Sequence, residues 1–205
     1  DHRIGHHFLQ AGVGYGGSCF PKDVKALAHI AEQNNVSPRI LHSVMDVNDF
    51  QRKRIMEKVR EELGELKGKR VALLGLAFKE NTDDLRESPA IGIAEYLVKG
   101  GADVYAYDPV AMDNAAKELP VVNYVESAYD AVEGAAAVVI ATPWNEFKNL
   151  DMQRILNSLK APILIDGRNM YDPDLMKEMG FKYRGVGRGF GGSGVNGDIE
   201  TTATL

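Results

Sequence analysis

Apolar residues in the first part of the chain recur at helical spacing. Pro21 suits the first turn of a helix, where its missing N–H costs nothing. Four apolar positions then follow one another at intervals of one, three or four residues: Val24, Leu27, Ala28 and Ala31. The pair Asn34-Asn35 ends the pattern, so we predict a helix between Pro21 and Asn34.

A second and longer helical pattern runs from Pro38 to about Leu66, and Ser37-Pro38 is typical of a cap and first helical position. Its apolar side comprises Ile40, Leu41, Val44, Val47, Ile55, Val59 and Leu63. About 28 residues at about 1.5 Å each give a helix of about 42 Å. A helix of this length needs more than one surface to pack on. We therefore expect it to bridge two domains or to pair with a second subunit.

After Gly64 and Gly68, which break the long helix, short apolar runs alternate with helical patterns. Strands are predicted at 70–75, 103–107, 137–141 and 163–165. Helices are predicted from Ser88-Pro89 to about Lys99 and near 127–133, 151–159 and 173–179. This alternation favours an α/β fold with a doubly wound parallel sheet over about 69–185.

These patterns divide the chain into three parts. We expect a helical region over 1–67, a parallel-sheet domain over 68–186 and a tail over 187–205. The tail is rich in Gly, Ser, Asn and Thr and has almost no large apolar residues, so it is expected to be disordered. The sequence opens at Asp1 without a methionine, and we expect the chain to be a fragment of a longer protein.

Composition excludes several classes of function. The 205 residues are 44% hydrophobic and carry a formal net charge of −5, so no broad nucleic-acid-binding surface is expected. No apolar run reaches the roughly 18 residues that a membrane span needs. Cys19 is the single cysteine, which excludes an internal disulfide and favours a cytoplasmic location. The five histidines show no spacing typical of metal ligands, so no metal is expected.

Cys19 is the first candidate for chemistry, because it follows a glycine-dense loop and directly precedes a predicted helix N-terminus. Glycines let the backbone approach a ligand closely, and the positive end of a helix favours a thiolate. Lys22 and Asp23 lie three and four residues further on. Together they would supply a nucleophile, a cation for a developing oxyanion and a carboxylate that acts on water. The alternative is a buried structural cysteine beside a solvated Lys-Asp pair.

The glycine run at 12–17 is not interpreted as a dinucleotide-binding loop. Such a fingerprint must follow a strand, whereas the residues from Arg3 to Gln10 look helical. The first predicted strand is followed by Gly-Leu-Ala-Phe-Lys at 75–79, without the G-x-G-x-x-G pattern. In the absence of those glycines, Asp108 at the end of the second strand is weak support for NAD bound within this domain.

The loops that follow the predicted strands contain the other candidates. A long polar loop at 79–87 follows the first strand, at the sheet edge where ligands bind in such folds. Lys79 and Arg86 could both hold phosphates, although a solvated charged loop is the alternative. Arg168 follows another strand and could reach the same pocket. Trp144, the only tryptophan, is expected mainly to pack.

Residues 14–23, Gly-Tyr-Gly-Gly-Ser-Cys-Phe-Pro-Lys-Asp, closely resemble the catalytic-cysteine motif of the UDP-glucose and GDP-mannose dehydrogenase family. Further landmarks follow in family order at 3–5, 75–79, 86–88, 107–109 and 166–168. The resemblance covers about residues 1–186. It implies a central helical region that forms a homodimer through the long helix, followed by a C-terminal Rossmann-like domain that binds the UDP-sugar.

The resemblance also implies a reaction, the NAD-dependent two-step oxidation of the C6 alcohol of a nucleotide sugar to a uronic acid. Cys19 resembles the thiol that attacks the C6 aldehyde to give a thiohemiacetal and then a thioester. Asp23 resembles the carboxylate that assists the water releasing the product. Lys22 resembles a lysine assigned to the cofactor or to the oxyanion.

Binding roles are implied by the same resemblance. Substrate contacts are implied for Arg3, Gly14, Tyr15, Gly16, Gly17, Ser18, Phe78, Lys79 and Arg168, with Arg3 reaching the substrate of a neighbouring subunit. Arg86 resembles a contact to NAD, which is held mainly by another domain of the family. The NAD fingerprint of that domain is absent from this sequence, so we expect the 205 residues alone not to turn over.

Several alternatives remain open. Phe20 followed by Pro21 favours UDP-glucose over GDP-mannose or another nucleotide sugar. A different class of function is a non-catalytic module for nucleotide binding and dimerisation, in which Cys19 is structural. A third class is a thiol hydrolase or acyltransferase, which would need a histidine base from among His6, His7 and His29.

Overall fold

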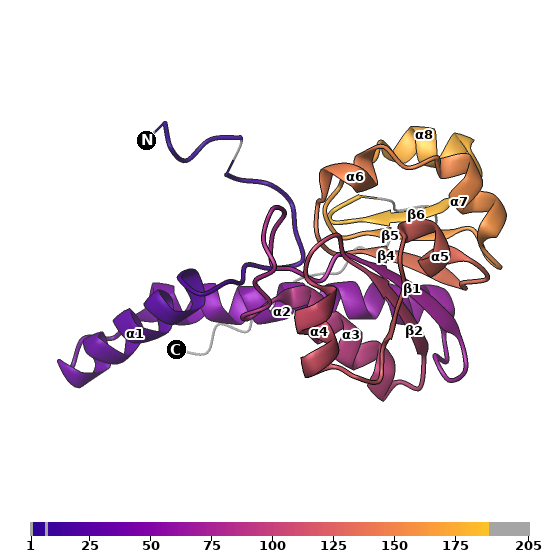
Figure 1. The fold of residues 1–205 in the computed structure, drawn as a ribbon. Helices are drawn as coiled ribbons and strands as arrows, with labels where there is room; N and C mark the ends of the chain where they lie inside the picture. The colour runs from indigo at the N-terminus through magenta and orange to yellow at the C-terminus, as the bar shows by residue number, and fades with distance from the viewer. Residues whose placement is uncertain (1, 7, 189–205) are drawn as a thin grey trace.

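A two-helix arm extends from a parallel α/β sheet domain in the computed structural model, which describes residues 2–6 and 8–188 (Figure 1). The arm consists of α1 (Phe20–Gln33) and the first half of α2 (Arg39–Leu63). As predicted, Asn34 terminates α1, while α2 ends at Leu63 with Gly64 as its C-cap, three residues before the predicted end near Leu66. The predicted cap was wrong in detail, since Pro38 is the N-cap of α2 and makes no side-chain cap hydrogen bond.

The prediction of a helix over Arg3–Gln10 was wrong. The described part of this segment contains only turns and bends, and the amides of Phe8 and Leu9 both donate to the carbonyl of Gly5, at 2.9 and 3.0 Å. Helices shorter than about 12 residues are marginal in water without a packing surface. Because Phe8 and Leu9 remain exposed, this segment gains little from forming one.

The sheet contains six strands in the order β3-β2-β1-β4-β5-β6, and every neighbouring pair is parallel. The strands are β1 Arg70–Leu74, β2 Asp103–Tyr107, β3 Asn123–Tyr124, β4 Ala137–Ile140, β5 Ile163–Asp166 and β6 Lys182–Gly185. This order is that of a doubly wound, Rossmann-like sheet, and it confirms the predicted fold class. The two edge strands, β3 and β6, were not predicted.

Helices cover both faces of the sheet. They are α3 Pro89–Lys99, α4 Met112–Glu118, α5 Ala128–Val132, α6 Asn145–Lys148, α7 Met152–Ser158 and α8 Pro173–Glu178. The predicted start of α3 is confirmed, because the Ser88 hydroxyl accepts a hydrogen bond from the amide of Ala90 and Pro89 occupies the first turn. The short helices α4 and α6 were not predicted.

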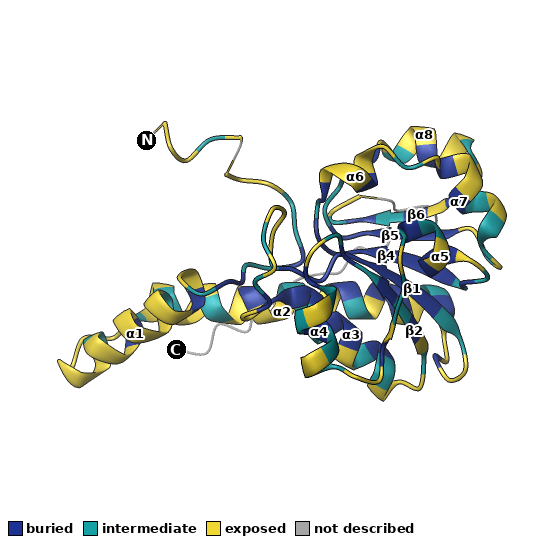
Figure 2. Ribbon diagram, in the orientation of Figure 1, coloured by how far each residue is buried: buried dark blue, intermediate teal, exposed yellow. Residues whose placement is uncertain are grey.

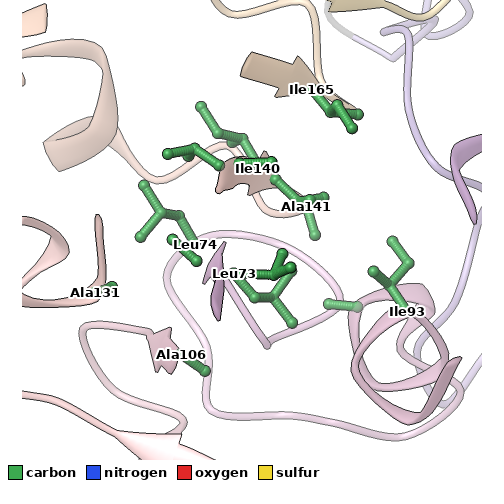
Figure 3. Close-up of a cluster of buried hydrophobic side chains, with 14 of the residues drawn as sticks. Leu73, Leu74, Ile93, Ala106, Ala131, Ile140, Ala141 and Ile165 are labelled. Carbon is green, nitrogen blue, oxygen red and sulfur yellow. The ribbon is translucent and has the colours of Figure 1, made fainter. Parts of the chain in front are cut away.

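The apolar core includes the second half of α2 as well as the sheet. Figure 3 shows Leu73 of β1 on the side of Ile93 from α3, and the adjacent Leu74 on the side of Ala131 from α5. Ile55 and Val59 of α2 are fully buried in the same cluster. Most of the arm is exposed in Figure 2. α2 is therefore half core element and half surface helix.

An ion cluster fastens α2 to the edge strand β6. The Glu62 carboxylate, whose side chain is only 2% exposed, lies 2.5 Å from Arg184 Nη1 and 2.5 Å from Lys182 Nζ. Arg184 Nη2 also lies 2.6 Å from Glu61. Burial, followed by the nearby positive charge of Arg184, lowers the pKa of Lys58 on the same helix. Charge pairing thus adds to apolar packing in fixing α2 against the sheet.

Most of the predicted tail lies outside the described residues. Only Gly187 and Arg188 of the range 187–205 are described, and the Gly185 amide donates to the Arg188 carbonyl at 3.1 Å. Among the helices of the described chain, none has the length and apolar character to cross a bilayer.

Replacing Ile55 by alanine tests the shared core. Ile55 is fully buried in α2, so Ile55→Ala is expected to lower the free energy of unfolding by about 2–5 kcal/mol. Leu175→Ala, at a 52% exposed position of α8, is the control and should cost less than about 0.5 kcal/mol. Urea denaturation measures both. An equal cost for the two variants would contradict the placement of α2 in the core.

Candidate functional site

The carboxyl ends of four strands lie in one row at the sheet edge. The paired last residues are Leu74 with Tyr107, Leu74 with Ile140, and Ile140 with Asp166. The loops that follow β1, β2, β4 and β5 therefore leave the sheet side by side, as the sequence predicted. This edge is where ligands bind in doubly wound sheets.

Asp108, directly after β2, connects the loops at this edge by hydrogen bonds. Its buried carboxylate accepts five hydrogen bonds at 2.7–3.1 Å, donated by the backbone amides of Leu76, Ala77, Val110 and Ala111 and by the Trp144 indole. Asp108 is fully buried, so these donors occupy the carboxylate that a ribose-binding acid would present to a ligand. Trp144 is buried and packs, as expected, while its N–H also fixes the carboxylate.

Asp166 plays a similar part at the end of β5. Its carboxylate accepts from the amides of Arg168 and Tyr171 and from the Tyr183 hydroxyl, each at 3.0 Å. Burial, together with the adjacent Asp166 charge, raises the pKa of Tyr183 well above its usual value, which keeps that hydroxyl a donor. The turn that carries Arg168 is thereby held at the sheet edge.

Arg168 lies under the start of the glycine-dense loop. A Cβ on Gly12 would stand 2.5 Å from Arg168 Nη1, so the backbone of Gly12 passes close to the guanidinium. Burial lowers the pKa of Arg168, while Glu80 and Asp166 oppose that shift. Its Nε is buried without a hydrogen-bond partner among the residues that the structure describes. A partly buried guanidinium with an unused donor is suited to an anionic ligand.

The glycine-dense loop at 12–18 packs directly on the loop between β1 and α3. A Cβ on Gly17, whose φ is +86°, would lie 2.6 Å from the ring of Phe78. A Cβ on Gly16 would lie 2.2 Å from the Glu87 carbonyl oxygen. The Gly17 amide donates to the Arg86 carbonyl at 2.8 Å. These glycines are required for close approach, which brings Cys19 beside the polar loop of the sheet.

Cys19 is exposed and occupies the N-cap position of α1. Its carbonyl accepts from the Asp23 amide at 2.8 Å, and its Sγ lies 3.7 Å from the Ser18 hydroxyl. Lys22 and Asp23 project from the same first turn, with Lys22 Nζ 3.3 Å from Asp23 Oδ1. The thiol, the ammonium and the carboxylate thus belong to the first turn of one helix, and their joint role stays a prediction.

The polar loop between β1 and α3 carries two cations, Lys79 and Arg86. Lys79 Nζ stands 5.3 Å from the centre of the Phe78 ring. Arg86 pairs with Asp84 through two hydrogen bonds, at 2.7 and 2.9 Å, and this pairing raises the pKa of Arg86.

Two segments of the chain match domains of one known family. Residues 72–173 match the UDP-binding domain of the UDP-glucose/GDP-mannose dehydrogenase family, and residues 1–50 match its central domain. The chain belongs to the UDP-glucose/GDP-mannose dehydrogenase family. The contact of the glycine-dense loop with the loop after β1 is thus a contact between the matched parts of the family's central and UDP-binding domains.

Family relatives of known name are similar over most of this chain. The UDP-glucose 6-dehydrogenase of Rickettsia conorii is 46% identical over 190 residues, which are 91% of this chain and 44% of that protein. The UDP-glucose 6-dehydrogenase of Pseudomonas aeruginosa is 47% identical over 195 residues, which are 92% of this chain and 43% of that protein. The chain therefore spans less than half the length of these relatives.

Solved structures of family members share the fold. A UDP-glucose dehydrogenase from Pyrobaculum islandicum superposes with a TM-score of 0.79 at 38% identity, covering 91% of this chain and 41% of that one. A GDP-mannose dehydrogenase from Pseudomonas aeruginosa, solved as a ternary complex, superposes with a TM-score of 0.73 at 27% identity, covering 92% and 43%.

The positions expected to bind ligands fall into two groups. The structure brings together the residues of the glycine-dense loop, Cys19, Phe78, Arg86 and Arg168 at the junction of the two matched domains. Arg3 instead lies on the exposed segment that precedes this loop. Its role toward a neighbouring subunit stays a prediction.

Three polar residues of α2 that the sequence analysis did not single out also touch the glycine-dense loop. Asn48 Oδ1 accepts from the Tyr15 amide at 2.7 Å, and Gln51 donates to the Gly12 carbonyl at 2.8 Å. Arg52 donates to the Tyr15 carbonyl at 3.0 Å. Their spacing of three and four residues places them on one helix face, which is the only signal of this role in the sequence.

Asp108→Asn tests the organising role of this carboxylate. An amide NH2 in place of either carboxylate oxygen leaves two or three buried N–H groups without an acceptor, so we expect a loss of about 2–4 kcal/mol in unfolding free energy. The control is Asp103→Asn at the exposed start of β2, which should change stability by less than about 0.5 kcal/mol. Urea denaturation gives both values. Equal stability of the two variants would refute the assignment.

Proposed function

We propose that this chain is the central and sugar-nucleotide-binding part of a UDP-glucose 6-dehydrogenase. One observation carries the proposal. The glycine-dense loop that precedes the exposed Cys19 packs on the loop after β1, at the sheet edge where ligands bind in such folds. Membership of the family supports the class of reaction. The similarity to proteins named UDP-glucose 6-dehydrogenase supports the substrate. We place the boundary between the two regions at residues 67 and 68.

In this proposal the sheet edge holds the nucleotide. Lys79 and Arg168 neutralise the diphosphate, and the ring of Phe78 offers an apolar surface beside Gly17. The backbone of Gly14, Tyr15, Gly16, Gly17 and Ser18 wraps the sugar and directs its C6 toward Cys19. Glycine at these positions permits the backbone to approach the ligand.

NAD, when bound, would supply the hydride acceptor for two oxidations at the sugar C6, and the hydroxyl proton lost in each oxidation would pass to water. After the first oxidation, Cys19 Sγ adds to the aldehyde carbon, and the resulting oxyanion takes up a proton to give a thiohemiacetal. Lys22 stabilises that oxyanion. The second oxidation leaves a thioester. Asp23 then accepts a proton from water as the water attacks, the C–S bond breaks, and the carboxylate and the free thiol are released.

The residues of this sheet do not form a site for NAD of their own. The amides of Leu76 and Ala77, which follow β1, already donate to Asp108, and the loop lacks the glycine fingerprint. Arg86 is exposed further along the same loop and is the residue of this chain that we propose contacts NAD. Most of the NAD site then belongs to a separate domain.

We further propose that the chain acts as a homodimer. Large apolar side chains on the arm and the segment before it are more than one third exposed: Ile4, Phe8, Leu9, Phe20, Leu27, Ile30, Val36, Ile40, Val44, Val47 and Phe50. A second copy would remove this surface from water. A cytoplasmic location accords with a free, exposed thiol.

Calorimetric titration with UDP-glucose, UDP and GDP-mannose tests the substrate. Binding of the UDP compounds without GDP-mannose would support the proposal. Tighter binding of GDP-mannose would transfer the assignment to a GDP-mannose dehydrogenase, and no binding of any of the three would contradict a preformed nucleotide site. Because Cys19 is exposed in the native chain, slower alkylation in the presence of UDP-glucose would indicate a thiol at the sugar, whereas unchanged alkylation would favour a thiol outside the site.

Replacing Lys79 tests the phosphate site. Lys79→Met removes one charge-assisted hydrogen bond to the diphosphate, so UDP should bind about 10–100-fold more weakly. The matched control is Lys99→Met, which loses an exposed ion pair with Glu95 within α3 and should leave the affinity unchanged. Calorimetry measures both variants. Equal affinities would remove Lys79 from the site.

The 205 residues alone should produce no NADH from UDP-glucose and NAD. The reason is that the loop after β1 lacks a dinucleotide fingerprint, and hydride transfer needs NAD held next to the sugar C6. NADH absorbance measures turnover, with the UDP-glucose 6-dehydrogenase of Pseudomonas aeruginosa as the positive control. Any cysteine-dependent NADH formation above the background of Cys19→Ser would overturn this expectation.

A further inference from the structure

One turn of α2 holds the backbone of the glycine-dense loop. The Asn48 side chain forms two hydrogen bonds with the backbone of Tyr15: it accepts from the amide at 2.7 Å and donates to the carbonyl at 3.2 Å. Gln51 donates to the Gly12 carbonyl at 2.8 Å, and Arg52 donates to the Tyr15 carbonyl at 3.0 Å. Asn48 is buried, so these bonds form away from water. The loop before Cys19 is thus set against α2.

Arg52 also reaches the other side of the junction. The same nitrogen that bonds the Tyr15 carbonyl lies 3.2 Å from the Glu87 carbonyl oxygen. Glu87 has a φ of +53°, a left-handed conformation that is unfavourable for a residue with a Cβ. Its immediate neighbour Arg86 accepts the bond from the Gly17 amide. Arg52 therefore links the cysteine loop to the end of the loop that carries Phe78 and Lys79.

Side-chain charge supports the same link. The Glu87 carboxylate pairs with Lys25 of α1 at 2.8 Å and lies 4.0 Å from Arg52 Nη2. Pairing with Lys25, and secondarily the charges of Lys25 and Arg52, lowers the pKa of Glu87. The Arg52 side chain is only 23% exposed, in contrast to a freely solvated surface arginine. The Arg52 guanidinium contacts both loops, and Lys25 of α1 joins the same group of contacts through Glu87.

We infer that Arg52 is a positioning residue, which sets Cys19 over the sugar by joining the cysteine loop to the sugar-nucleotide loop. The inference rests on the proposed function, because it assumes that the sugar C6 lies at Cys19. Nucleophilic attack requires the reacting atoms to be held within a narrow range of distance and direction. A guanidinium suits this task, since its planar donors fix two carbonyls more rigidly than a single ammonium.

The test uses Cys19 as a single-site reporter, because the chain has no other cysteine. Iodoacetamide alkylation is measured in wild type, in Arg52→Met and in Arg54→Met. Arg54 is the matched control, an exposed arginine of the same helix whose guanidinium lies 5.8 Å from the centre of the Phe50 ring. Calorimetry with UDP, which lacks the sugar, gives the nucleotide affinity of each variant separately.

With UDP-glucose at about 100 times its Kd, wild type and Arg54→Met should be alkylated at least about tenfold more slowly than without ligand. Arg52→Met should keep its UDP affinity within about threefold but lose most of this protection, to less than about twofold. Protection equal to that of wild type at matched occupancy would overturn the inference. If Arg52→Met does not fold, Arg52→Lys takes its place, with the same loss of protection expected from its shorter reach.

Amide hydrogen exchange in the ligand-free chain separates this inference from the proposed function. Loss of the link should speed exchange at Tyr15 and Gly17 by at least about tenfold in Arg52→Met but not in Arg54→Met. No difference would refute the positioning role whether or not UDP-glucose binds. If wild type does not bind UDP-glucose but exchange is faster in Arg52→Met, the proposed function is refuted and the positioning of the loop by Arg52 is not.

Discussion

The burial of the second half of α2 in the core of the sheet is the constraint on which the rest of the structure depends. Ile55 and Val59 lie in the same apolar cluster as Leu73 of β1, and the Glu62 ion pairs fasten the end of the helix to β6. Because α2 is fixed to the sheet, the hydrogen-bonding groups of Asn48 and Arg52 are also fixed relative to the sheet. They hold the glycine-dense loop in place. The glycine-dense loop can then meet the loop after β1 without an extended interface of its own.

The sheet shows how one fold can serve two ligands. A doubly wound sheet that binds dinucleotides uses a glycine-rich turn after β1, where free backbone amides meet phosphate. In this chain the Asp108 carboxylate accepts hydrogen bonds from the amides of Leu76 and Ala77, so these two donors are not available to a phosphate. In the function that we propose, the side chains of Lys79 and Arg168 supply the positive charge. The same topology would then bind phosphate by side chains and not by backbone amides.

Much of the fold could be predicted from sequence, for identifiable reasons. The central strands β1 and β4 are buried on both faces and read as continuous apolar runs. The edge strand β6, Lys-Tyr-Arg-Gly, shows alternating burial in so short a segment that it gives little signal. In the site, the motif around Cys19 is local and could be read directly. Asn48 and Arg52 contact Tyr15 across 33 and 37 residues, so their role depends on which face of α2 meets the loop.

The continuity of α2 gives the arm the properties of a lever. Its 25 residues form one uninterrupted helix of about 37 Å, at about 1.5 Å per residue. A tilt of about 10° about its buried end would displace the far end by about 6 Å over that length. The ion pairs with β6 act at the short end of this lever, close to the fulcrum. A small change in the tilt of α2 is therefore amplified at the exposed tip, where the surface that we propose meets a second subunit lies.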